Sequence, residues 1–134
     1  MITDERITAY INSLDSGDGE LCDEIAGEAA ASFVPIIKRE TAALLKTMVA
    51  LKQPKHILEV GTAVGYSALL MARIMPKDAH ITTIEKFEKR IPVAKANFKK
   101  AQLEDRITLL EGDAGEILAD LSGSFDFIFM DAAK

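Results

Sequence analysis

Glycines or acidic residues follow four short apolar segments of this 134-residue chain. The groups at these four ends are Glu59 with Gly61, Glu85, Asp113 and Asp131. In an open sheet of parallel strands, ligands bind outside the carboxyl ends of the strands. We therefore expect these side chains to gather at one edge of a sheet and to form a binding site. One such group after one strand is ordinary, whereas a suitable group after each of four strands indicates function.

The first of these loops, residues 59–67, reads EVGTAVGYS and carries two glycines in the spacing G-x-x-x-G. Gly61 permits a tight turn and a close approach of a ligand to the backbone. Gly65 allows the next helix to begin close to the strand. The dinucleotide fingerprint G-x-G-x-x-G is absent because Ala63 takes the middle position, which disfavours a nicotinamide enzyme. Glu59 favours a ligand with an ammonium group, because a carboxylate repels a pyrophosphate. A tight turn without a ligand is the alternative.

The next two ends could contact a nucleoside. The carboxylate of Glu85 can accept hydrogen bonds from both hydroxyls of a ribose. Asp113, or a backbone group beside it, could bond to the edge of an adenine. The alternatives are a solvent-exposed acid paired with a nearby lysine for Glu85, and a simple helix N-cap for Asp113.

Strands and helices alternate in the segments that would position these groups. Strands are expected at 56–60, 81–84, 106–110 and 125–130, and helices between them at 65–75, 87–102 and 114–121. This alternation predicts an α/β fold whose parallel sheet has right-handed crossovers and helices on both faces.

The N-terminal part of the chain is predicted to be helical. Thr3 is the expected cap of a first helix, and the glycine-containing stretch 15–19 ends it. Two further helices are expected at about 20–31 and 38–51. The chain thus reads as one domain, 1–134, in which a helical extension (1–33) precedes an α/β part (34–134).

Composition excludes several classes of protein. The chain is 49% hydrophobic and 28% charged with 8 Gly and 4 Pro, which is typical of a globular domain. Its 16 basic and 21 acidic residues give a net charge of −5, which argues against a surface that binds polyanions generally. The single Cys22 precludes an intrachain disulfide. No apolar run is long enough for a membrane span and the N-terminus is too charged for a signal peptide, so we expect a cytoplasmic protein without a membrane partner.

Three stretches resemble a known family. ILEVGTAVGYSALLMA at 57–72, VPI at 34–36 and FIFMDAAK at 127–134 are similar to metal-dependent O-methyltransferases of the catechol and caffeoyl-coenzyme-A type. That family uses S-adenosylmethionine (SAM) and has a Rossmann-like class I methyltransferase fold. The closest likeness is to a bacterial branch that includes tRNA 5-hydroxyuridine methyltransferases.

The resemblance implies a set of residues that contact SAM. They are Glu59, Gly61, Ser67 and Ile37 for the methionine part, Glu85 for the ribose hydroxyls, and Asp113 with Ala114 for the adenine.

The resemblance also implies a Mg²⁺ site and a methyl acceptor. Asp131 would be a metal ligand and Lys134 the general base. Mg²⁺ prefers oxygen ligands, so an acceptor with two adjacent oxygens could chelate it. The expected acceptor is a hydroxylated uridine in tRNA or a small catechol-like phenol. The five lysines from 86 to 100 form a basic face that is usually solvated but that an RNA would favour.

The sequence departs from the family after Lys134. The family's other two metal ligands, an Asp and an Asn, follow a further strand. We therefore expect the chain to be a C-terminally truncated part of a longer, homodimeric enzyme. Alone, it is expected to bind SAM poorly and metal hardly at all, and to be inactive. The alternatives from other classes are an NAD-linked oxidoreductase and a non-catalytic domain that pairs through its exposed sheet edge.

Overall fold

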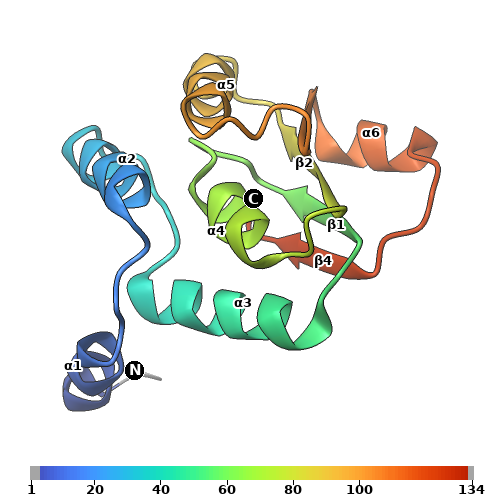
Figure 1. Cartoon of the computed structure of the whole chain (residues 1–134). Helices are drawn as coiled ribbons and strands as arrows, with labels where there is room; N and C mark the ends of the chain where they lie inside the picture. Colours follow the sequence, from blue (N-terminus) through green and yellow to red (C-terminus); the bar gives the residue numbers. More distant parts are fainter. Residues whose placement is uncertain (1–3, 133–134) are drawn as a thin grey trace.

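Four parallel strands form one sheet in the order β3-β2-β1-β4 in the computed structural model, which describes residues 4–132 (Figure 1). The strands are β1 (His56–Val60), β2 (His80–Glu85), β3 (Ile107–Glu111) and β4 (Phe127–Met130). The chain runs outward from β1 to β3 and then returns to the other side of β1 to form β4. This reversal is the point at which open α/β sheets place their ligands.

Six helices accompany the sheet within the described residues. They are α1 (Glu5–Ser13), α2 (Glu20–Ala31), α3 (Arg39–Lys52), α4 (Tyr66–Ile74), α5 (Ile91–Lys100) and α6 (Ala114–Asp120). The predicted α/β class, the alternation of elements and the parallel sheet are confirmed.

Several predicted boundaries are wrong, three of them for a clear physical reason. Helix α5 begins at Ile91 rather than at residue 87, because Pro92 fits only the first turn of a helix. β4 begins at Phe127, and Phe125 packs against the second core cluster below instead of joining the strand. The N-cap of α1 is Asp4, whose side chain accepts a hydrogen bond from the Arg6 backbone N–H at 2.8 Å. Thr3, the predicted cap, lies outside the described residues.

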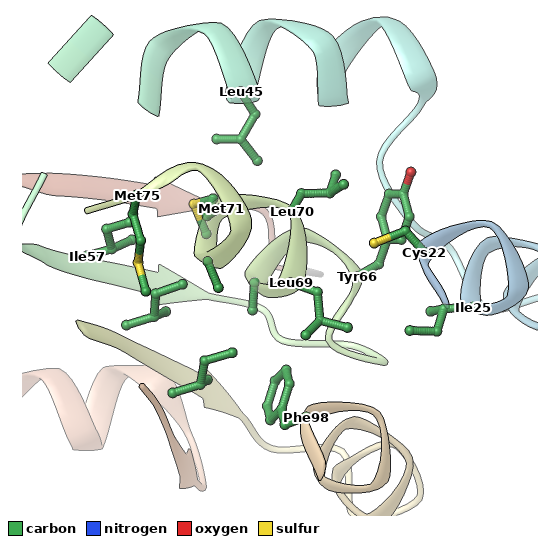
Figure 2. Close-up of a cluster of buried hydrophobic side chains, with 14 of the residues drawn as sticks. Cys22, Ile25, Leu45, Ile57, Tyr66, Leu69, Leu70, Met71, Met75 and Phe98 are labelled. Carbon is green, nitrogen blue, oxygen red and sulfur yellow. The ribbon is translucent and has the colours of Figure 1, made fainter. Parts of the chain in front are cut away.

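The larger core cluster lies between the sheet and helices α2, α3, α4 and α5. Every second residue of the strands faces it, as Ile57 and Ile81 do, and both are fully buried. Figure 2 shows α4 at its centre, with Leu45 of α3 pointing towards it, and Phe98 of α5 belongs to the same cluster. Each fully buried side chain of this size contributes about 2 kcal/mol to folding, so this cluster fixes the sheet against the helices.

A smaller cluster lies on the opposite face of the sheet, under α6. Leu58, Val60 and Ile84 are its buried members, so both faces carry a helix, as predicted. The residues of β4 that are in register with the first two are Ile128 and Met130. They remain 58% and 63% exposed, because α6 covers the β2 side of this face.

The N-terminal helices differ in how they attach. Helix α2 buries Cys22, Ile25 and Ala29 in the larger core, as expected for a cysteine that serves as a packing residue. Helix α1 buries no side chain. The stretch between them is held by ion pairs from Lys46 of α3 to Asp15, at 3.4 Å, and to Asp18. Among the described residues, no helix has the length and apolar character required to cross a bilayer.

Candidate functional site

A cavity of about 670 Å³ opens at the carboxyl ends of the strands. The ends of all four strands contribute to its wall, and the segment before α3 closes one side through Pro35 and Ile36. Of the residues predicted for the site, those that line the cavity are Gly61, Glu85, Asp113, Ala114 and Asp131. The fold therefore brings together predicted site residues that are up to 70 positions apart in the sequence, from 61 to 131.

The two glycines of the first loop are required by their neighbours. Gly61 has φ +102°, and a Cβ there would collide with the backbone carbonyl of Asp131. Gly65 has φ +88°, and a Cβ would lie 2.6 Å from the Phe98 ring of α5. Both positions combine a backbone conformation that favours glycine with a lack of space for a side chain. The G-x-x-x-G spacing thus brings β4 and α5 close to the loop.

The end of β2 holds this loop in place. The carbonyl of Ile84 accepts hydrogen bonds from the N–H groups of Gly61 and Thr62, at 3.0 and 3.2 Å. Next to it, the Glu85 carboxylate accepts the Ala63 N–H on Oε2 at 2.8 Å. Ala63 is a non-glycine residue with φ +48°, so it needs such external support.

Glu85 is buried, yet its carboxylate faces the cavity. Its Oε1 accepts two further backbone N–H groups, from Lys86 at 3.1 Å and Phe87 at 2.9 Å. A carboxylate has about four acceptor positions, so one position on Oε2 remains for a ligand. Its pairing with a nearby lysine, the alternative for this residue, is not observed: Lys86 bonds instead to Asp113, at 3.3 Å.

Glu59 lies behind the loop, fully buried, and does not line the cavity. It accepts hydrogen bonds from Ser67 Oγ and Thr83 Oγ1, each at 2.5 Å. Burial raises the pKa of Glu59 to about 7; the two hydroxyls oppose this rise, and the charges of Asp131 and Glu85 add to it. Ser67 is buried with it. The structure thus brings Glu59 and Ser67, two predicted SAM-binding residues, together, and they are hydrogen-bonded to each other.

Asp113 is the N-cap of α6, which was the structural alternative for this residue. Its side chain accepts the Gly115 N–H at 2.9 Å, and Lys86 Nζ lies 3.3 Å away. The Gly115 hydrogen bond, and secondly Lys86, lower the pKa of Asp113 below its usual value. The carboxylate is thus kept charged at the cavity wall.

The three remaining predicted site residues are Ile37, Asp131 and Lys134. Ile37 is not part of the cavity wall, whereas its neighbours Pro35 and Ile36 are. Asp131 lines the wall, but no three potential ligands among His, Cys, Asp and Glu converge within residues 4–132. Lys134 lies outside the described residues.

Sequence reasoning missed one wall of the cavity. The Arg90 guanidinium lies over the Phe87 ring, 5.1 Å from its centroid, and both side chains line the cavity. Both residues were predicted to lie inside a helix, where Phe87 gives no signal of a site. The wall offers a flat apolar face and a cation to a ligand.

The parallel sheet and the cavity at its reversal point define an α/β protein of the class that binds nucleotide-like ligands at the strand ends. The sequence profile of the O-methyltransferase family matches residues 13–134, so the chain belongs to this family.

Relatives of known name agree with this family. A catechol O-methyltransferase of Niastella koreensis is 36% identical, in a match that covers 97% of this chain and 62% of the relative. A caffeoyl-CoA O-methyltransferase of Stellaria longipes is 38% identical, with 68% of this chain and 40% of the relative covered. The chain therefore spans less than two thirds of the length of these relatives.

Solved structures share the fold. The SAH-bound methyltransferase PaMTH1 of Podospora anserina has a TM-score of 0.88 and 31% identity, over 98% of this chain and 60% of that one. The O-methyltransferase TomG of Streptomyces achromogenes, solved in complex with SAM, has a TM-score of 0.83 and 29% identity, over 98% and 63%. These similarities agree with the predicted Rossmann-like methyltransferase fold.

Proposed function

We propose that this chain is the cofactor-binding part of a SAM-dependent O-methyltransferase of the catechol and caffeoyl-CoA type. The observation that carries the proposal is the cavity at the strand ends, where Glu85 presents one open acceptor position. Structural relatives named as SAH-bound and in complex with SAM support the choice of ligand.

The cavity fits such a ligand in size and polarity. Its volume of about 670 Å³ lies within the range of about 300–1,000 Å³ that small-molecule sites have. Glu85 would accept a ribose hydroxyl, and Asp113 with Ala114 would lie beside the adenine. Gly61 would let the methionine part approach the backbone. When bound, SAM supplies a methyl group on a positively charged sulfur, which makes that methyl electrophilic.

The role of the chain in transfer is to bind and orient. The loop 61–65 is fixed from β2 and α5, since Asn97 Nδ2 also donates to the Val64 carbonyl at 2.8 Å. A preformed loop avoids the entropic cost of ordering when the ligand binds. Alignment of two bound reactants is a large part of such catalysis.

We further propose that the whole protein depends on a divalent metal, Mg²⁺, and that Asp131 contributes one ligand. Residues 4–132 do not fit a complete metal site, since no three potential ligands converge there. Lys134 remains the proposed general base.

The proposed acceptor is a catechol-type phenol. Three lysines of the predicted basic face pair with acids: Lys86 with Asp113, Lys95 with Glu111, and Lys100 with Glu24. This pairing weakens the attraction of this face for RNA. Comparing methyl transfer to catechol and to tRNA bearing 5-hydroxyuridine, catalysed by the whole protein, distinguishes the two acceptors.

Calorimetric titration of this chain with SAH and with NADH tests the ligand. We expect SAH to bind weakly and NADH not to bind. Glu85→Ala should weaken SAH binding, whereas Glu88→Ala, at an exposed acid three residues away, should leave it unchanged. Binding of NADH without SAH would support the oxidoreductase alternative and overturn the proposal.

A further inference from the structure

Four buried polar side chains, one of them from the loop 61–65 itself, are linked by hydrogen bonds on the side of the loop away from the cavity. They are Glu59, Thr62, Ser67 and Thr83, and each is at most 8% exposed. Thr62 Oγ1 and Thr83 Oγ1 are 2.6 Å apart, and Thr83 Oγ1 is 2.5 Å from Glu59 Oε1. None of the four lines the cavity, so they act on a ligand only through the loop.

The direction of these bonds follows from the number of protons. When Glu59 is ionised its carboxylate only accepts, so Thr83 donates its single hydroxyl proton to Glu59. Thr62 must then be the donor in its bond to Thr83. The bonds therefore run from Thr62 to Thr83 to Glu59, while Ser67 donates to the other carboxylate oxygen. Thr83 is the link between the loop residue and the buried carboxylate.

We infer that Thr83 is a positioning residue, whose hydroxyl holds Thr62 and thereby fixes the cavity-lining backbone of Gly61 and Ala63. Thr83 is the first of three successive β2 residues that hold the loop. Ile84 does so through its carbonyl and Glu85 through its carboxylate. Thr83 alone among them acts from the side away from the cavity, so a ligand cannot replace its bond.

Thr83→Val tests this role because valine keeps the branched shape and removes the hydroxyl. Valine removes both hydrogen bonds of the Thr83 hydroxyl, and we expect SAH to bind about tenfold more weakly, which corresponds to about 1.4 kcal/mol. Thr83→Ser keeps the hydroxyl and should restore the affinity to within about twofold. Thr82→Val, on the same strand but on the opposite face of the sheet, is the matched control and should leave affinity unchanged.

The same variants are compared without ligand by hydrogen exchange of the Thr62 and Ala63 amides. Thr83→Val should accelerate exchange at both amides, and Thr83→Ser should not. Unchanged affinity and exchange in Thr83→Val would overturn the inference, as would a loss in Thr83→Ser equal to that in Thr83→Val.

The inference rests on the proposed function only for the choice of SAH as the probe. If the unaltered chain binds no SAH, the proposed function fails, while the ligand-free exchange still decides the role of Thr83. If Thr83→Val does not fold, Thr62→Val removes the same bond from the loop side. Faster exchange at Ala63 in that variant would support the inference, and unchanged exchange would overturn it.

Discussion

Replacing Glu59 with glutamine should flatten the pH dependence of stability of this chain. Glu59 is fully buried, and burial raises its pKa from 4.5 to about 7 despite the hydroxyls of Ser67 and Thr83. The charges of Glu85 and Asp131 act in the same direction as burial. In the unfolded chain the carboxyl ionises near its ordinary value, so the unfolded state releases its proton at lower pH.

The size of the effect follows from the two pKa values. Below pH 4.5 the carboxyl is neutral in both the folded and the unfolded state, and its full contribution to the free energy of unfolding is present. As the pH rises from 4.5 to about 7 the stability is lost progressively, and above that range no further loss occurs. The interval between the two values corresponds to about 3 kcal/mol. Glutamine does not titrate, so its variant lacks this slope.

Urea unfolding of both proteins between about pH 5 and pH 8 measures the difference. Glutamine can accept one hydroxyl on its oxygen and donate its N–H₂ to the other, because hydroxyls rotate. Glu88→Gln, at an exposed acid, is the control and should keep the slope of the unaltered chain. Equal slopes for Glu59→Gln and the unaltered chain would refute the reasoning that Glu59 is a buried, titrating carboxyl.

Three further substitutions test contacts at the first loop, in the larger core and between β4 and β1. Gly61→Ala should destabilise the chain and abolish SAH binding, because the added Cβ collides with the carbonyl of Asp131. Thermal unfolding measures the stability and calorimetry the binding. A variant that folds and binds normally would contradict the close approach of Asp131, directly after β4, to the loop. Leu70→Ala should cost about 2–5 kcal/mol in urea unfolding, since Leu70 is 1% exposed in the larger core, and a cost below about 1 kcal/mol would be inconsistent with that burial. Asp126→Ala should lower the urea midpoint of unfolding, because the carboxylate accepts the backbone N–H groups of Lys55 and His56 at 2.9 and 2.8 Å. An unchanged midpoint would show that these hydrogen bonds between the starts of β4 and β1 do not stabilise the chain.

The sequence predicted the class of fold because periodicity and turn residues are local signals. The alternation of short apolar runs with helical segments was sufficient for a parallel sheet with helices on both faces. The start of α5 was missed because proline is tolerated in a first turn, so Pro92 marks a beginning rather than an interior kink. The order of strands, and hence the reversal between β1 and β4, depends on contacts between distant segments.

The sequence predicted the cavity-lining residues that lie at the ends of strands. It described less well the residues that lie inside the strands. Gly61 and Glu85 are at strand ends and line the cavity. Glu59 precedes the end of β1 by one residue, so it faces the same side as Ile57 and meets Ser67 in the core. Thr83 is paired with Glu59 in the register of β1 and β2, which no local pattern contains.

The most direct test of the central claim is the crystal structure of this chain with SAH. We expect density for the ligand across the ends of β1, β2 and β3, with a ribose hydroxyl bonded to Glu85 and the adenine beside Ala114. Density at another surface, or side chains that fill the space between Gly61 and Glu85, would contradict it.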